Sequence, residues 1–282
     1  MSDYCDLHIH TTASDGQLSP DEVVSFAQSK NLKAISICDH DTISGYEQLS
    51  KLYPSLTDGT LLVSEMEVIP GIEISCSWDN REIHILGYFC DPGCQEFSEI
   101  QTRLKESRLK RVNLILDKLK SMGIHIDLSQ VLEKSSGDSV GRPHIAQAMY
   151  ENGYVKSVGE AFELYIGYGR PAYVERFRLT PFESIGSIRH AKGVPVWAHP
   201  QLANADHLLP ELIENGLQGL EVYHPQHDQH AVGKYKSLAS EHGLVITGGS
   251  DFHSHSIPYG ATIGSYGVCY KTVEVMRSLA QR

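Results

Sequence analysis

The feature that most constrains this chain is that its short apolar runs end in histidine and acidic side chains. DLHIH ends with His8 and His10, CDHD contains His40, and GGSDFH ends with Asp251 and His253. The runs VPVWAHP and LQGLEVYHP end in the same way. In folds that alternate strands and helices, functional sites lie at the carboxyl ends of the strands. The pattern therefore predicts an α/β protein whose histidines and acids meet at one site.

Helix signals separate the apolar runs near both ends of the chain. Ser19, Pro20 and Glu22 supply a capping side chain, a proline at the first helical position and a glutamate three residues after the cap. Alternating strand and helix units favour parallel strands, and we predict a β/α barrel. The segments GIEISCSW and REIHILGYF flank Asp79 and Asn80, which predicts a β-hairpin within it.

A purely helical pattern replaces this alternation in the middle of the chain. Apolar residues recur there with a helical period and Gly123 closes the run, which predicts one long amphipathic helix. The apolar positions are Ile100, Leu104, Val112, Ile115, Leu119 and Met122. Strand signal is nearly absent from there to residue 180. We expect a barrel made from residues 1–97 and 191–282, interrupted by a helical insertion over residues 98–190.

Charge is divided unevenly between these two parts. The formal net charge of -11 argues against tight non-specific binding to nucleic acid. Residues 98–192, however, hold 15 of the 24 Lys and Arg residues and 11 of the 35 Asp and Glu residues, a net of +4. The remaining residues carry 9 basic and 24 acidic side chains, a net of -15. The basic segment is either ordinary helix-surface charge or a surface that faces an anion.

Composition also limits where the protein is expected to work. The chain has no apolar run of about 18 residues, the length that suggests a membrane span. The N-terminal MSDYCDLHIH lacks the basic and apolar segments of a secretory signal. The six cysteines form no C-x-x-C pair, which favours free thiols in a reducing compartment. We expect a cytoplasmic protein that does not enter a membrane.

The spacing of the histidines indicates metal chemistry. His8 and His10 are two apart on a strand, so both face one side and can share an ion, although hydrogen-bonded polar residues would give the same spacing. The predicted hairpin places Ser75 opposite His84, and Glu73 diagonal to His84 at about 7–8 Å. Oxygen and nitrogen ligands without a thiolate suit Mn, Fe or Zn in a hydrolytic site. Such ions generate hydroxide at neutral pH and clamp a phosphoryl group.

Sequence motifs also carry a family resemblance. DLHIHTTASDG, CDHDT, GIEIS with HILGY, AHP and GSDFH follow one another along nearly the whole chain. In this order they resemble the PHP (polymerase and histidinol phosphatase) family of phosphoesterases. The resemblance implies a distorted seven-stranded β/α barrel with a small helical insertion and two or three divalent metal ions. The ligands it implies are His8, His10, Glu73 and Asp251 for one ion, Glu73, His84 and His199 for a second, and Asp15, His40 and His253 for a third.

The segments GRPHIAQAM, EAFELYIGYGRPAYV and GVPVWAHP look like one PHP subgroup. It includes nucleoside 3′,5′-bisphosphate phosphatases and the 5′→3′ exoribonuclease called ribonuclease AM. The resemblance implies that the insertion covers the metal site, and its positive charge then makes it a phosphate-facing substrate lid. Arg142 and Arg170 are candidate phosphate ligands, because guanidinium matches phosphate geometry, although each could instead fix its own loop. His144 begins a helix and could bind an anion or cap the helix.

The leading interpretation is an enzyme, a metal-dependent phosphoric ester hydrolase. We expect it to hydrolyse the 3′-phosphate of nucleoside 3′,5′-bisphosphates to nucleoside 5′-monophosphate and phosphate through a metal-bound hydroxide. His224 could face the substrate or protonate the leaving oxygen. The alternatives are a 5′→3′ exoribonuclease on short RNA, a phosphatase of another phosphomonoester such as histidinol phosphate, and a metal-binding module without catalysis. We expect a small nucleotide or short oligonucleotide as partner, and no stable complex with long nucleic acid.

Overall fold

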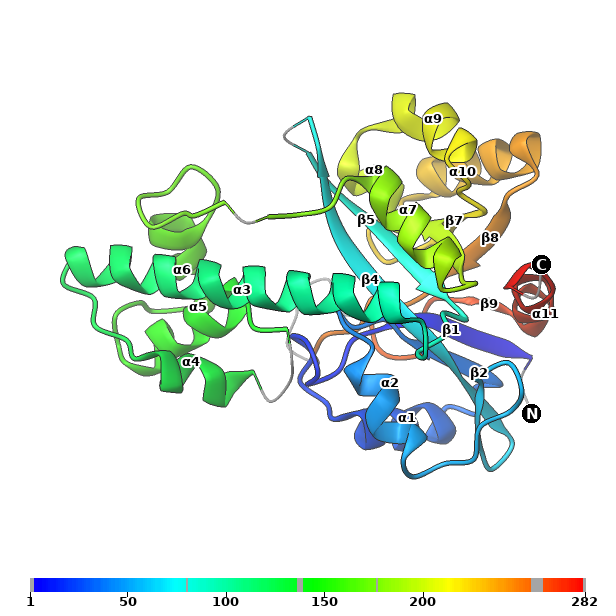
Figure 1. Ribbon diagram of the computed structural model, residues 1–282, viewed down its shortest axis with the longest axis horizontal. Coiled ribbons are helices and arrows are strands. Elements are labelled where there is room, and N and C mark those ends of the chain that lie inside the picture. The colour runs from blue at the N-terminus through cyan, green and yellow to red at the C-terminus, as the bar shows by residue number, and fades with distance from the viewer. Residues whose placement is uncertain (1–2, 80, 136–138, 176, 255–260, 281–282) are drawn as a thin grey trace.

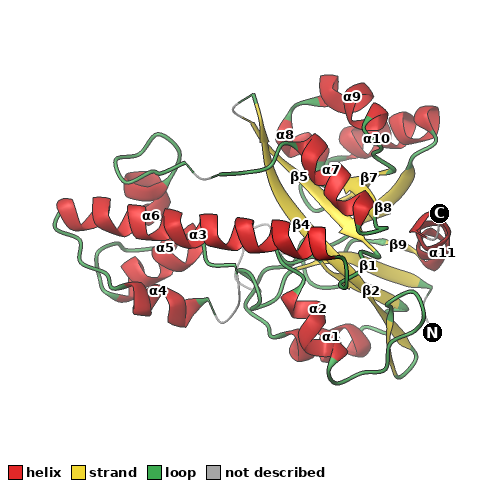
Figure 2. Ribbon diagram, in the orientation of Figure 1, coloured by secondary structure: helices red, strands yellow, loops and turns green. Residues whose placement is uncertain are grey.

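One strongly curved sheet organises the molecule, with helices covering its outer side (Figures 1 and 2). The structure, a computed structural model, describes residues 3–79, 81–135, 139–175, 177–254 and 261–280. Its strands are β1 (Tyr4–Ile9), β2 (Ala34–Ile37), β3 (Leu61–Val63), β4 (Met66–Trp78), β5 (Arg81–Tyr88), β6 (Val194–Trp197), β7 (Gly219–Tyr223), β8 (Val245–Gly248) and β9 (Val268–Cys269). They hydrogen-bond in the order β8-β7-β6-β5-β4-β2-β1-β9, and β3 pairs with β4.

The strands β8 and β1 approach each other and nearly close a barrel. The backbone N–H of Asp251, just after β8, donates to the carbonyl oxygen of His8 on β1 at 2.8 Å. Ile9 and Phe252 form an isolated parallel bridge at the same seam. The wall consists of β8, β7, β6, β5, β4, β2 and β1, and it confirms the predicted distorted β/α barrel.

Most neighbouring strands of the wall are parallel, as the alternation of strands and helices predicts. The pairs β1·β2, β2·β4, β6·β7 and β7·β8 are parallel, whereas β4·β5 and β5·β6 are antiparallel. The hairpin register is the predicted one, with Ser75 opposite His84 and Glu73 opposite Leu86. Asn80, the second residue of the predicted turn, lies outside the described residues.

The helices begin and end where local chemistry favours it. The Ser19 side chain accepts a hydrogen bond from the Glu22 N–H, and the Glu22 side chain accepts one from the Ser19 N–H. These two bonds form the predicted capping box at the start of α1. Gly123, at φ 83°, follows the long helix α3. The helices are α1 (Pro20–Ser29), α2 (Ser44–Ser50), α3 (Gln95–Ser121), α4 (Leu128–Lys134), α5 (Arg142–Glu151), α6 (Val158–Ala161), η1 (Phe162–Ile166), α7 (Pro181–His190), α8 (Pro200–Ala203), η2 (Asp206–Leu208), α9 (Leu209–Glu214), α10 (Gln229–His242) and α11 (Tyr270–Ala280). None of these helices is long and apolar enough to cross a membrane.

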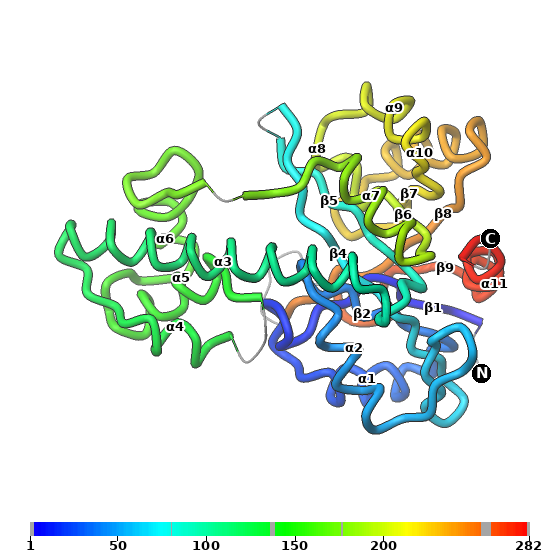
Figure 3. Tube along the Cα trace, in the orientation of Figure 1, coloured from blue at the N-terminus to red at the C-terminus, as the bar shows by residue number. Residues whose placement is uncertain are grey.

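The helices from α3 to η1 form a group beside the barrel. Helix α3 runs out from the barrel along this group, and the chain returns to α7 beside it (Figure 3). Arg111 donates to the carbonyl of Val174, and Lys118 donates to the carbonyl of Tyr173, both at 2.7 Å, which holds the returning segment against α3. The group encloses its own apolar core, which includes Val112, Ile115, Leu119, Ile145, Met149 and Ile166.

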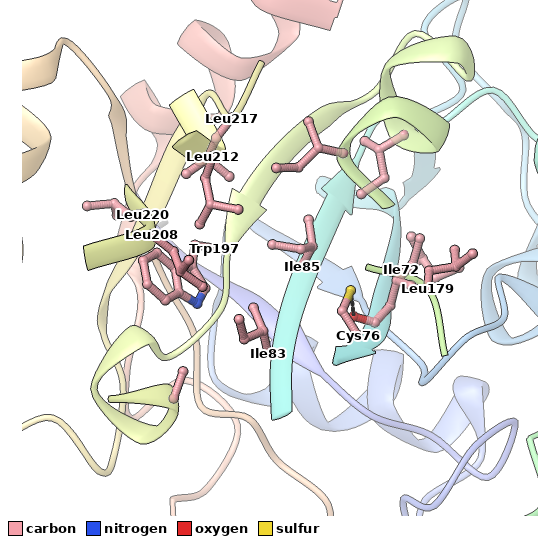
Figure 4. Packing of buried hydrophobic residues seen from close by; sticks show 14 of the residues in the cluster. Ile72, Cys76, Ile83, Ile85, Leu179, Trp197, Leu208, Leu212, Leu217 and Leu220 are labelled. Atoms are coloured by element: carbon pink, nitrogen blue, oxygen red, sulfur yellow. Dashed lines mark hydrogen bonds between the residues drawn. The ribbon is translucent and has the colours of Figure 1, made fainter. Parts of the chain in front are cut away.

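The apolar face of the β4–β5 hairpin fixes which way its polar face points. Ile72, Ile83 and Ile85 are at most 1% exposed and pack outward with Trp197 and other buried residues (Figure 4). Side chains alternate along a strand, so a one-residue slip would send these isoleucines to the other face. Burial of the isoleucines therefore holds the glutamate and histidine of the same hairpin toward the barrel interior.

Candidate metal centre

Two histidines from β1 begin a buried polar cluster inside the barrel mouth. The side chains of His8 and His10 are completely buried, and their Nε2 atoms lie 3.2 Å apart. Gly249 makes room for this arrangement, because a Cβ atom there would lie 2.4 Å from the Cβ of His8. Because Gly249 has no side chain, the segment GGSDFH passes close to β1 before Asp251 and His253 enter the cluster.

Glu73 lies at the centre of the cluster. Its Oε1 is 2.8 Å from His84 Nδ1 and 2.9 Å from His199 Nε2. Its Oε2 is 2.9 Å from His40 Nδ1 and 3.3 Å from His10 Nε2. The carboxylate is 1% exposed, so it connects three imidazoles that follow strand ends and one from within β5 in a place that water barely reaches.

Asp251 and Asp15 contribute the remaining carboxylates. Asp251 Oδ1 lies 3.1 Å from His10 Nε2 and 3.4 Å from His8 Nε2. Asp15 Oδ1 lies 3.3 Å from His253 Nε2. The structure therefore brings together all nine residues predicted as ligands, which are His8, His10, Asp15, His40, Glu73, His84, His199, Asp251 and His253.

The donor atoms of this cluster suit a divalent cation. Among the described residues, ligand atoms lie within 4.8 Å of one another in three groups, which are His10, Asp15, His40 and His253; His8, His10 and Glu73; and His40, Glu73 and His84. The nitrogens of His8 and His10 face each other and the same carboxylates, an arrangement that a shared cation stabilises. Imidazole and carboxylate donors without a thiolate fit Mn, Fe or Zn.

Glu221 is an outer partner of the cluster and is not among the nine predicted ligands. Its Oε1 lies 2.9 Å from His8 Nδ1, and its Oε2 accepts the backbone N–H of His199 at 2.9 Å. A proton held on Nδ1 leaves the Nε2 lone pair of His8 pointing at the cluster. Its place near the end of the apolar run LQGLEVYHP puts it among the acids at predicted strand ends, but the sequence does not indicate its contact with His8.

Electrostatics keep the carboxylates charged despite burial. Burial opposes ionisation of Glu73, but the neighbouring His84, His40 and His8 hold its pKa well below the usual value. Burial opposes protonation of His84, but Glu73 raises the pKa of that imidazole to about 10. Burial opposes protonation of His253 as well, and Asp15 and Asp251 raise its pKa to about 10. In the metal-free protein, protons on these imidazoles thus neutralise the buried carboxylate charge. A bound cation would neutralise the same charge in the metal-loaded protein.

Three residues of the site have backbone conformations that L-amino acids rarely adopt. The φ angles are 60° for Asp41, 28° for His199 and 48° for Asp251. Residues other than glycine keep a positive φ only when the surrounding structure holds them in that conformation. Each of the three ends or follows a strand, so strain is concentrated where the strands present their polar side chains.

A cavity of about 140 Å³ adjoins the cluster on the side of the helical group. Asp15, His40 and His84 line it from the barrel. Four arginines also line it, which are Arg108, Arg111, Arg142 and Arg178; Arg178 is paired with Glu82 of β5. Of these four, the sequence predicts Arg142 alone as a phosphate ligand, because position along a helix says little about which face meets another part of the chain.

The structure separates the predicted substrate residues. Arg142 lines the cavity and stacks near the rings of Phe162 and Tyr173. Arg170 is exposed and does not belong to the residues that line this cavity. His144 is buried at the start of α5, where its Nδ1 accepts the N–H of Gly141, and it too lies outside the cavity lining.

His224 lies against the metal ligands rather than in the arginine cavity. Its Nε2 is 3.2 Å from Asp251 Oδ2, and it is 1% exposed. Its Nδ1 accepts the backbone N–H of Gln226, so the ring proton lies on Nε2 and points at Asp251. In this position His224 orients a carboxylate of the cluster.

Comparisons with known proteins agree with this geometry. A family model described as the PHP domain matches residues 6–168. The 5′-3′ exoribonuclease Rnm of Escherichia coli is 32% identical over 88% of this chain and 84% of its own length. The 3′,5′-nucleoside bisphosphate phosphatase of Chromobacterium violaceum is 28% identical over 88% of this chain and 87% of its own. A solved structure assigned as a metal-dependent phosphoesterase, from Bifidobacterium adolescentis, has a TM-score of 0.85 and 27% identity, covering 98% of this chain and 96% of that one.

The barrel, the buried His and carboxylate cluster and these relatives define a metal-dependent phosphoric ester hydrolase. Enzymes of this kind use divalent cations to polarise a phosphoryl group. The chain belongs to the PHP family.

Proposed function

We propose that this chain hydrolyses the 3′-phosphate of nucleoside 3′,5′-bisphosphates, releasing phosphate and the nucleoside 5′-monophosphate. The observation that carries the proposal is the arginine-lined cavity beside the His and carboxylate cluster. The cluster offers a place for the phosphate that reacts, and the arginines offer a place for a second one. The Chromobacterium violaceum relative bears the name of this activity.

Arg108, Arg142 and Arg178 are the proposed ligands of the second phosphate. Guanidinium groups bind phosphate oxygens through paired hydrogen bonds, and all three line one small cavity. Arg170, a phosphate ligand predicted from the sequence, is not included in this set, because its side chain is exposed and does not line the cavity. The helical insertion, with its net charge of +4 over residues 98–192, then acts as a substrate lid over an acidic barrel.

For the metal sites we propose the three ion assignments that the family resemblance implies. One ion would be held by His8, His10, Glu73 and Asp251, a second by Glu73, His84 and His199, and a third by Asp15, His40 and His253. Bound Mn, Fe or Zn would lower the pKa of water and neutralise charge on the phosphoryl oxygens. Glu221 would fix the tautomer of His8, and His224 would hold Asp251 in place.

A second candidate is a 5′→3′ exoribonuclease on short RNA, which the 32% identity to the Escherichia coli exoribonuclease favours. The two reactions break the same bond. In both, water adds to phosphorus and the 3′ oxygen of a nucleoside 5′-monophosphate leaves. They differ in whether that phosphorus also carries the next nucleotide. The same arginine cavity would hold the terminal 5′-phosphate in either case.

Turnover measurements separate the candidates. Purified protein with Mn²⁺ is assayed on adenosine 3′,5′-bisphosphate, adenosine 3′-monophosphate, histidinol phosphate and a ladder of 5′-phosphorylated oligoribonucleotides. We expect the bisphosphate to have the highest kcat/KM and the short oligonucleotides to follow. Failure to release phosphate from the bisphosphate, with good turnover of histidinol phosphate, would reject the proposal. Faster turnover of the oligonucleotides would favour the exoribonuclease.

A further inference from the structure

Asp41 joins three parts of the site through one buried residue. Its Oδ1 accepts the backbone N–H of Ser75 at 2.8 Å, and its own N–H donates to the carbonyl of Glu73 at 2.9 Å. Its Oδ2 lies 2.7 Å from Nε and 2.6 Å from Nη2 of Arg108 on α3. The carboxylate is 1% exposed, so these contacts replace water rather than compete with it. The loop after His40, the strand that carries Glu73 and the insertion helix α3 are therefore tied together at Asp41.

The contact between Asp41 and Arg108 lies at the edge of the proposed substrate cavity. Its guanidinium lines the cavity together with Asp15, His40 and His84, and the side chain is 12% exposed. An arginine already held through Nε and Nη2 loses less rotamer freedom when it binds an anion. A carboxylate beside the cavity lowers its positive potential, so attraction of anions cannot be the reason for an acid at this position. Orientation of the guanidinium is a role that the geometry does support.

We propose that Asp41 is a positioning residue that orients Arg108 toward the phosphate that is not hydrolysed, and so sets the preference for substrates with two phosphates. The proposal rests on the function proposed above, because that function assigns the second phosphate to this cavity. The competing explanation is that Asp41 only fastens α3 to the barrel. The two differ in substrate dependence, since a fastening contact would affect all substrates alike.

A double-mutant cycle tests the proposal. The variants are Asp41→Asn, Arg108→Gln and the double variant; asparagine keeps an oxygen for the Ser75 N–H while losing the charge. Lys110→Ala is the matched control, because it removes a positive charge from the exposed side of the same helix. Each protein is assayed on adenosine 3′,5′-bisphosphate and adenosine 3′-monophosphate. In parallel, adenosine 5′-monophosphate is titrated into chelator-treated protein by calorimetry.

Each single variant is expected to lower kcat/KM for the bisphosphate about 10- to 100-fold, mainly through KM, which is the range for a charged hydrogen bond. Turnover of the 3′-monophosphate should change less than about threefold, and the Asp41 change should have almost no further effect in the Arg108→Gln background. Lys110→Ala should match the wild type on both substrates. Equal losses on both substrates, or independent effects of the two changes, would overturn the proposal.

The nucleotide titration distinguishes failure of this proposal from failure of the proposed function. If the wild-type protein has the same kcat/KM for adenosine 3′,5′-bisphosphate and for adenosine 3′-monophosphate, the proposed substrate is wrong. Adenosine 5′-monophosphate binding then decides the role of Asp41. Weaker binding in both single variants, with no further loss in the double variant, supports positioning of Arg108. Binding that is unchanged by Asp41→Asn rejects it.

Discussion

The carboxylate of Glu73 meets the imidazole of His84 across the β4–β5 hairpin, with Oε1 2.8 Å from Nδ1. The two residues are diagonal rather than opposite, since Glu73 pairs with Leu86 and His84 with Ser75. Their contact depends on a hairpin register that the buried isoleucines hold on the other face. The same carboxylate also reaches His199 and His40, so one side chain unites the cluster.

Glu73→Gln is expected to remove most bound metal and to lower kcat/KM by more than about 100-fold. Changes to outer partners of metal ligands alone cost about 10- to 100-fold, and Glu73 lies at the centre of the cluster. Metal content by inductively coupled plasma mass spectrometry and phosphate release check the prediction. Glu65→Gln, an exposed glutamate just before β4, is the matched control and should behave as the wild type. Full metal content in Glu73→Gln would contradict the assignment.

Asp15→Asn is expected to remove about one ion per chain and to leave the ion at His8 and His10 in place. Asp15 contacts His253 at 3.3 Å but lies 3.9 Å from the nearest nitrogen of His10. Metal counting on the purified variant gives the result directly. Loss of every ion would show that the cluster binds metal as a single unit, and retention of every ion would exclude Asp15 as a ligand.

Glu221→Gln is expected to weaken metal binding or activity by about 10- to 100-fold while the fold persists. Glutamine keeps an oxygen for one of the two bonds to His8 and His199 but loses the negative charge that fixes the His8 tautomer. A metal titration followed by activity measures the shift in metal requirement. An unchanged titration curve in a folded variant would limit Glu221 to packing.

The metal-free protein is expected to lose stability as the pH rises from 7 to 10. The pKa values of His84 and His253 are raised from 6.5 to about 10, so their contribution to folding is complete below pH 6.5 and is lost as the pH rises through 10. Thermal unfolding of chelator-treated protein across this range should therefore show a falling Tm. The metal-loaded protein should fall less, because ligated imidazoles are already neutral.

Two histidine variants control the pH experiment. His84→Gln should remove part of the decline in Tm, whereas His190→Gln should not, because the His190 side chain is 73% exposed. A Tm that stays constant or rises between pH 7 and 10 in the metal-free wild type would contradict the proposed proton balance. The carboxylates act in the opposite direction: the lowered pKa of Glu73 adds stability above its ordinary pKa, which is lost in acid.

Much of the barrel and its metal cluster follows from local sequence. The capping box at Ser19, the hairpin register and the strand that ends in His8 and His10 all depend on residues within a few positions of one another. Strand ends of a β/α barrel meet at one mouth, so the polar residues at those ends were bound to gather there. The full set of nine ligands, Asp15 among them, was named from the family resemblance rather than from this geometry.

The arginine cavity and the outer partners depend on contacts far apart in the chain. Asp41 and Arg108 are 67 positions apart, and His8 and Glu221 are 213 apart. Helical periodicity places Arg108 on a face of α3 but does not say which part of the protein that face meets. Such pairs become visible only when the helices of the insertion are packed beside the barrel.

Arg142 and Arg170 show most directly the difference between what local sequence determines and what tertiary packing determines. Both occur in the tripeptide Gly-Arg-Pro, and the sequence gives no reason to prefer either. Arg142 starts α5 and lines the cavity, whereas Arg170 follows η1 and is exposed. The sequence by itself determined the strand ends, the hairpin register and the metal-binding residue types, because these follow from local periodicity. The packing of the helical group against the barrel alone decided which arginines face the cluster, because identical local segments differ only in what lies across from them.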